Sequence, residues 1–131
     1  MTMKLEIVAV FSICAVLITA PGTGSDFVAL ADDSGNALYG GVSKLRQACD
    51  AMSDDPRLTE AAQRHADDML HNGVSGHIGS DGSSPQGRIA DAGYTRNRAT
   101  GEIVFWATGS AATPNEALDM WMQSPPHRGI I

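Results

Sequence analysis

The sequence predicts a single domain of the α+β class, built from three or four helices and one buried strand. Its 131 residues suit one domain with a core of modest size. Apolar residues recur at helical spacing, and the run EIVFWATG from residue 102 is bounded by glycines and rich in branched and aromatic residues. A single strand cannot satisfy its own backbone groups, so the sequence also predicts that this strand needs pairing partners.

The start of the chain has the order of a secretory signal peptide. Lys4 gives a weakly positive beginning, an apolar run covers residues 7–19, and small residues follow. We expect cleavage between Ala20 and Ser25. The run is shorter than the roughly twenty apolar residues of a membrane span, so an uncleaved anchor is the less favoured alternative. The chain then divides into a signal peptide (1–25), an N-terminal linker (26–35) and the domain itself (36–131).

The charge of the chain excludes two classes of partner. The net charge is −6, and removing residues 1–25 takes away one Lys and one Glu, which leaves it unchanged. An acidic protein gains nothing from counterion release on nucleic acid or from attraction to anionic lipid. We therefore expect a secreted, extracellular protein of the cell envelope with no nucleic-acid partner and no stable membrane span after signal cleavage.

The first segments of the mature chain are a linker and a helix. Residues 26–35 are expected to form a short apolar piece and a polar turn. Residues 36–52 place five apolar side chains on one helical face. Cys14 leaves with the signal peptide, so Cys49 is the only cysteine of the mature chain, and its place on this face predicts burial. The face consists of Leu38, Val42, Leu45, Cys49 and Met52.

The next helix has the clearest boundaries in the sequence. Asp55 can cap it, Pro56 suits the first helical position, and Gly73 follows as a stop. Two later helices are bounded in the same way, by Ser84, Pro85 and Gly93 and by Thr113, Pro114 and Pro125. The helix that begins at Pro56 has an apolar stripe, which consists of Leu58, Ala61, Ala62, His65, Ala66, Met69 and Leu70.

Three histidines, His65, His71 and His77, follow one another at intervals of six residues. Six residues turn a helix by about 600°, so the first two lie on different faces, whereas metal-binding pairs favour spacings of three or four. His65 is expected to be a core histidine hydrogen-bonded to a neighbouring loop, and His71 to face solvent. His77 lies beyond the helix, between Gly76 and Gly79, where a side chain can approach a ligand or tie down its own turn.

Two further residues are candidates for a site. Glu102 opens the apolar strand directly after a glycine. It is either an exposed strand end or a buried carboxylate that needs a cation, a metal or several donors. His127 follows a double proline. It is either a site residue, presented rigidly because the prolines fix the backbone, or an exposed histidine in a loop that ends a helix. Nothing local decides between these alternatives.

Several short motifs occur in a fixed order along the chain, and together they indicate a family more specifically than any one of them does. They are AAQRHADDM, SGHIGSDGSSPQGRI, AGY, GE before an apolar strand, and W-M-x-S-P-x-H-R. Over residues 38–131 they resemble the CAP superfamily. This family comprises the cysteine-rich secretory, antigen-five and pathogenesis-related-1 proteins, also called SCP-like extracellular proteins. The resemblance is to its bacterial branch, of actinobacterial or mycobacterial type. It implies an α–β–α sandwich with a cleft lined by two histidines and two acidic residues, able to bind Zn²⁺ or another divalent cation. His77, Glu102 and His127 match three of these positions, and His77 and His127 would be the metal ligands. Glu116 is nearest to the fourth, but a capping role explains it more simply.

The chain also departs from the family pattern. Ile103 replaces the Asn that usually follows Gly-Glu, and Ser43 stands near the place of an Asn in the first helix. The family continues past its His-Arg motif into strands that complete the sheet, where relatives often carry a cysteine that could pair with Cys49. The resemblance therefore implies a sheet that is incomplete at its C-terminal end, in a fragment or a degraded paralogue.

Three functions follow, in order of preference. The first is non-enzymatic binding of a lipid or cell-envelope ligand in a cleft formed by His77, Glu102 and His127. The second is a truncated, inactive CAP paralogue with uncovered apolar faces. The third is a Zn-dependent hydrolase in which His77 and His127 bind the metal and Glu102 is a ligand or general base. Catalysis ranks last because the sequence shows no serine or cysteine nucleophile with a paired base.

Overall fold

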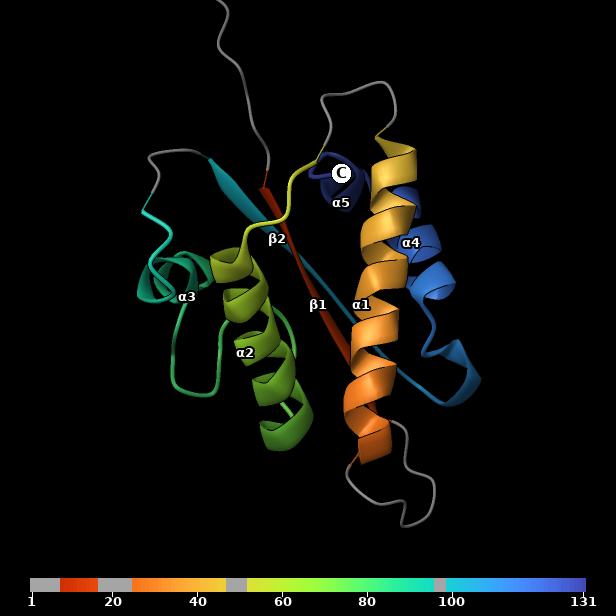
Figure 1. The fold of residues 1–131 in the computed structure, drawn as a ribbon, viewed down its shortest axis with the longest axis horizontal. Helices are drawn as coiled ribbons and strands as arrows, with labels where there is room; N and C mark the ends of the chain where they lie inside the picture. The colour runs from red at the N-terminus through yellow and green to blue at the C-terminus, as the bar shows by residue number, and fades with distance from the viewer. Residues whose placement is uncertain (1–7, 17–24, 47–51, 96–98) are drawn as a thin grey trace, which may run out of the picture.

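The structure, a computed structural model, describes residues 8–16, 25–46, 52–95 and 99–131. Within these ranges it contains two strands and five α-helices, with one short 3-10 turn (Figure 1). This composition confirms the α+β class, while Cys49 lies outside the described residues. The elements are β1 (Val8–Val16), α1 (Ser25–Leu45), α2 (Pro56–Asn72), α3 (Pro85–Asp91), β2 (Thr100–Thr108), η1 (Gly109–Ala111), α4 (Pro114–Gln123) and α5 (Pro125–Arg128).

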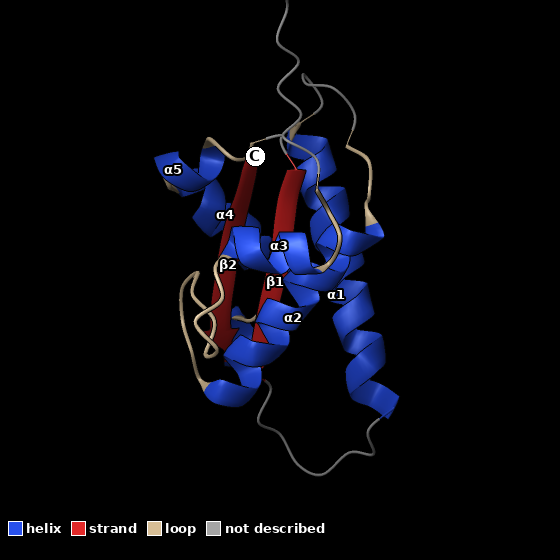
Figure 2. Ribbon diagram, turned by 90° about the vertical axis from the view of Figure 1, so that its left-hand side faces the viewer, coloured by secondary structure: helices blue, strands red, loops and turns tan. Residues whose placement is uncertain are grey.

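The two strands form a parallel sheet that lies between two layers of helices (Figures 1 and 2). α2 and α3 cover one face, and α1 and α4 cover the other. Successive side chains of a strand point to opposite faces. Ile103 and Phe105 therefore enter the core with α1 and α4, whereas Glu102 faces α3. This arrangement is the α–β–α sandwich that the family resemblance implied.

The partner of β2 comes from the start of the chain. The sequence placed residues 7–19 in a signal peptide and implied that the partners of β2 were missing. In the structure, the backbone of β1 pairs with β2 along its whole length. Cleavage of the signal peptide stays a prediction, and its removal would take β1 away from both β2 and α2. In the described part of the chain, no helix is long and apolar enough to cross a membrane.

The start of α1 corrects the prediction for residues 26–35. A short apolar piece and a polar turn were expected there, but the helix begins at Ser25 and continues through the whole segment. Gly35 and Asn36 are exposed, and a Cβ at Gly35 would meet nothing within 4 Å. A poor helix former on an exposed face destabilises the helix only by its low helix propensity, which is about 1 kcal/mol for glycine relative to alanine. Such residues therefore do not force a turn.

The predicted ends of the later helices are confirmed, whereas the helix expected over residues 36–52 ends at Leu45. Asp55 caps α2 by accepting a hydrogen bond from the backbone N–H of Arg57 at 3.1 Å, with Pro56 at the first helical position. Gly73 ends α2 in the left-handed conformation, with φ of 65°. The other two caps are bonds from Gly87 N to Ser84 Oγ at 3.1 Å and from Glu116 N to Thr113 Oγ1 at 3.2 Å.

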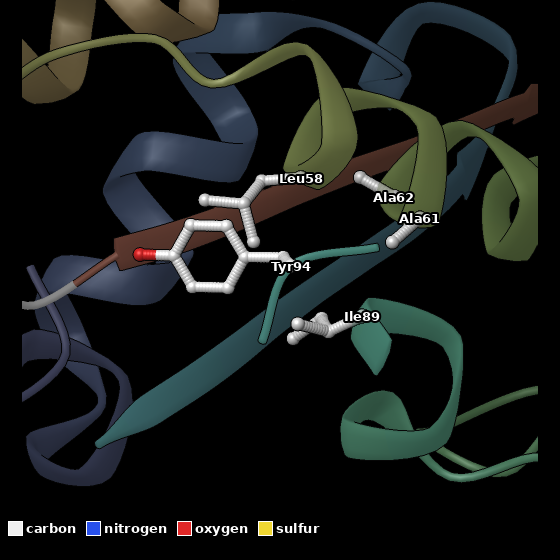
Figure 3. Close-up of a cluster of buried hydrophobic side chains, with 5 residues drawn as sticks. All are labelled: Leu58, Ala61, Ala62, Ile89 and Tyr94. Atoms are coloured by element: carbon white, nitrogen blue, oxygen red, sulfur yellow. The ribbon is translucent and has the colours of Figure 1, made fainter. Parts of the chain in front are cut away.

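Two apolar clusters hold the layers together. The first joins α2 to α3 and the segment that follows it (Figure 3). The second joins α1, β2 and α4 around Trp121, which is completely buried. The Trp121 ring meets Phe105 edge-on with 6.5 Å between centroids, and its Nε1 donates to the carbonyl of Val104 at 3.1 Å. The first cluster is Leu58, Ala61, Ala62, Ile89 and Tyr94, and the second is Leu38, Ile103, Phe105, Ala117 and Trp121.

Candidate functional site

His77 lies in the loop between α2 and α3, where its side chain is 47% exposed. Its Nδ1 lies 2.9 Å from Oε1 of Glu102, the third residue of β2. A carboxylate only accepts hydrogen bonds, so Nδ1 carries the proton in this contact, and in the neutral imidazole Nε2 then holds the lone pair. The contact therefore leaves Nε2 as the ring nitrogen that can accept a hydrogen bond from a ligand.

Glu102 is buried beneath this imidazole, with only 3% of its side chain exposed. Its second oxygen, Oε2, accepts a hydrogen bond from Nη2 of Arg88 at 2.8 Å, and the Arg88 side chain is 2% exposed. Two opposite charges in contact offset part of the large cost of removing each from water. Glu102 thus lies between a buried guanidinium and a half-exposed imidazole and bonds to both.

Arg88 holds the His77 loop as well as the carboxylate. Its Nη1 donates to the backbone carbonyl of Ser83 at 2.9 Å, and its Nη2 donates to that of His77 at 3.1 Å. α3 positions Arg88 because Ser84 caps the helix and Ile89, the next residue, is buried in the first apolar cluster. One guanidinium therefore fixes both the side chain that orients His77 and the backbone that carries it.

The other two histidines of the series occupy the places predicted for them. His65 is completely buried, and its Nε2 lies 2.8 Å from the carbonyl oxygen of Gly76, immediately before His77. This confirms a core histidine bonded to a neighbouring loop. His71 is on the surface, with Nδ1 2.7 Å from the backbone oxygen of Asp67, one turn earlier. His65 therefore serves the site indirectly, by anchoring the loop.

Two aspartates tie down the far side of the same loop. Asp68 on α2 accepts hydrogen bonds from the hydroxyl and the backbone N–H of Ser80, and these bonds lower its pKa. Hydrogen bonds from Ser83 hold the pKa of Asp81 well below its usual range. A Cβ at Gly79 would lie 2.8 Å from both Asp81 Oδ1 and Ser83 Oγ, so a side chain there would displace these two hydrogen-bonded groups. The loop is a fixed support for His77.

His127 lies in α5, since the double proline that ends α4 also opens this short helix. The chain end that follows packs near Glu102, because a Cβ at Gly101 would lie 3.3 Å from Ile130. However, no hydrogen bond or ion pair joins His127 to His77 or Glu102 among the residues that the structure describes. The structure therefore brings two of the three predicted site residues into contact.

The residues around His77 do not fit a divalent metal. In the ranges that the structure describes, no three His, Cys, Asp or Glu side chains gather as a metal-binding group. Both oxygens of Glu102 already bond, and the Arg88 guanidinium beside it would repel a cation. His77 Nε2 is one available donor, whereas catalytic zinc sites use three protein ligands.

Arg88 is the site residue that sequence reasoning missed. It lies within the SGHIGSDGSSPQGRI motif, and the expectation that a buried Glu102 needs a cation pointed to some arginine or lysine. The spacing of residues in the sequence could not identify Arg88 as the partner, because the ion pair joins a helix, α3, to a strand, β2. Glu116, the nearest candidate for a second acidic position, is exposed in the first turn of α4.

Comparison with known proteins identifies the family. The model of the CAP cysteine-rich secretory protein family matches residues 42–131. This range contains His77, Arg88, Glu102 and His127, and it covers most of the chain. Comparisons with curated proteins and with solved structures gave no match. The chain therefore belongs to the CAP cysteine-rich secretory protein family.

Proposed function

We propose that the protein is exported and acts as a non-enzymatic binding module for a lipid or other cell-envelope ligand, at the site of His77, Glu102 and His127. The predicted signal peptide, the net charge of −6 and membership of the CAP family support this role. The observation that carries it is the contact between His77 and Glu102: a half-exposed imidazole is held by a buried carboxylate, with one ring nitrogen available.

The surroundings of His77 favour binding over catalysis. A carboxylate and the imidazole that it orients are also two members of a hydrolytic triad, whose third member is a nucleophile hydrogen-bonded to the second ring nitrogen. In the described part of the chain, no serine, threonine or cysteine side chain hydrogen-bonds to the His77 ring. The hydroxyl of Ser80 bonds to Asp68, and that of Ser83 lies 3.3 Å from Arg88. Both hydroxyls therefore stabilise the loop and do not hydrogen-bond to the His77 ring.

A second surface offers room for an apolar ligand. A groove of about 720 Å³ lies between α1 and α4. Its lining includes Gly40 and Gly41 of α1, and Leu118 of α4 packs against Gly41. The groove and the His77 site are separate candidates for the place of the ligand, and substitutions can distinguish them. The groove is lined by Ala37, Gly40, Gly41, Lys44, Leu45, Asn115, Leu118 and Asp119.

The proposed function is tested by lipid retention. The purified protein is mixed with a total envelope lipid extract, recovered by gel filtration and analysed for bound lipid by mass spectrometry. We expect the wild type to retain a lipid and His77→Ala to bind it about threefold to tenfold more weakly, the value of one hydrogen bond. His71→Ala, which removes an exposed histidine from the adjoining helix, should bind as the wild type does.

Two results would count against this proposal. A wild-type protein that retains no lipid would exclude a lipid-binding function and favour the inactive paralogue. Normal retention by His77→Ala together with loss in Gly40→Leu would move the ligand to the groove, because Gly40 lines the groove and a Cβ there meets nothing within 4 Å.

A further inference from the structure

We infer that Arg88 sets the ligand class of the His77 site: the site excludes cations and accepts a hydrogen bond from the terminal hydroxyl of an amphiphile. This inference rests on the proposed function, since it specifies the ligand of the same site. It differs from the metal binding that the family resemblance implied. Three features of the described residues carry it: the charge of the buried pair, the protonated nitrogen of His77, and the apolar surface beside it.

The buried pair beneath His77 has no net charge. Glu102 contributes one negative charge and Arg88 one positive charge, 2.8 Å apart, and each side chain is at most 3% exposed. A metal ion or an ammonium group near His77 would be attracted by the carboxylate and repelled by the guanidinium, so the neutral pair gives it little net attraction. A dication would give up its hydration for one neutral imidazole nitrogen, which is too little to hold it.

The contact with Glu102 also decides what His77 offers to a ligand. Nδ1 donates to Oε1 of Glu102, so Nε2 of the neutral ring is an acceptor. An anion needs a donor, and the Arg88 guanidinium is 2% exposed: its Nη1 and Nη2 already bond to protein oxygens, and its Nε, which has no hydrogen-bond partner among the described residues, is buried. The group that suits Nε2 is therefore a neutral donor, and in an envelope amphiphile that group is a hydroxyl.

The residue next to His77 supplies apolar contact. Ile78 is 56% exposed, although it lies in a loop that its neighbours hold firmly. Apolar surface buried against such a side chain contributes about 25 cal/mol per Å². Ile78 directly follows His77 in the chain, so the inference assigns the apolar body of the ligand to this side chain. The site therefore suits a hydroxyl carried on an apolar body.

The ligand class is tested with three matched probes that share one alkyl chain: decanol, its methyl ether and decanoate. We expect decanol to bind about threefold to tenfold more tightly than the ether, which cannot donate, and more tightly than decanoate. The preference for decanol over the ether should disappear in His77→Ala and persist in His71→Ala. Equal affinity for decanol and the ether, or no binding of either, would overturn the inference. Lipid retention from the extract would then still stand, so the two failures are distinguishable.

The role of Arg88 is tested by titration with Zn²⁺. We expect wild type, His77→Ala and His127→Ala to bind Zn²⁺ equally weakly. Arg88→Gln should gain about tenfold or more in Zn²⁺ affinity, because it removes a positive charge and frees an oxygen of Glu102. Arg88→Lys keeps the charge and should behave as the wild type, which a purely structural role of Arg88 would not explain. If the Arg88 variants do not fold, the first comparison still decides: loss of Zn²⁺ binding in either histidine variant would overturn the inference.

Discussion

Replacing Arg88 with methionine is expected to lower the free energy of unfolding by about 3–5 kcal/mol, the usual cost of breaking a buried ion pair. The substitution leaves the Glu102 carboxylate buried without its counter-charge, since both side chains are at most 3% exposed. It also leaves the backbone carbonyls of Ser83 and His77 without the guanidinium that bonds to them. Urea denaturation followed by circular dichroism measures the change.

Two controls accompany this variant. In the double variant Arg88→Met with Glu102→Leu, the unpaired charge is gone, so most of the lost stability should return. Arg64→Met removes an exposed arginine that pairs with Asp81 and Asp91, and we expect a much smaller effect there because solvent screens such pairs. Equal losses in Arg88→Met and Arg64→Met would show that the Arg88 pair is not buried in solution.

Replacing Trp121 with alanine is expected to cost about 3–5 kcal/mol, the range for deleting a large buried aromatic side chain. Trp121 is completely buried where α1, β2 and α4 meet, and its loss also leaves the carbonyl of Val104 without a donor. Met120, the preceding residue, is 48% exposed, and its replacement with alanine should change stability by about 0.5 kcal/mol or less. Similar effects of the two substitutions would contradict the packing of α4 on the sheet.

The features that the sequence predicted correctly depend on local patterns. A cap such as Asp55 followed by Pro56 acts within one helical turn, so the ends of α2 could be read directly. The burial of His65 followed from its place in an apolar stripe, and the β2 strand from an uninterrupted run of branched and aromatic residues, although Trp106 of this strand is 62% exposed. In each case the residues that decide the structure lie next to one another in the sequence.

The features that the sequence missed depend on partners far along the chain. The pairing of β1 with β2 joins residues 8–16 to residues 100–108, and no local pattern records which strand pairs with which. Arg88 likewise became a site residue because α3 packs against β2. The helical start of α1 was missed for another reason, since turn-forming residues tolerate a helix wherever their face is exposed.

The candidate site was found mainly through the family resemblance. Each of His77, Glu102 and His127 had an equally simple explanation when taken alone, and the ordered motifs connected them. The structure then adds what the motifs do not contain, namely the partners of each hydrogen bond and the buried guanidinium that pairs with the Glu102 carboxylate. These details are the basis for inferring that the site takes a hydrogen-bond donor rather than the divalent cation that the family resemblance implied.

The most direct test of this account is the protonation state of the His77 ring, measured by ¹⁵N–¹H correlation NMR at about pH 8, where an ordinary histidine is neutral. We expect Nδ1 of His77 to carry the proton in the wild type, because Oε1 of Glu102 accepts the hydrogen bond from it. In Glu102→Ala this preference should be lost, while His71 stays unchanged in both proteins. A proton on Nε2 of His77 in the wild type would contradict the account, because the site would then have no acceptor for a ligand hydroxyl.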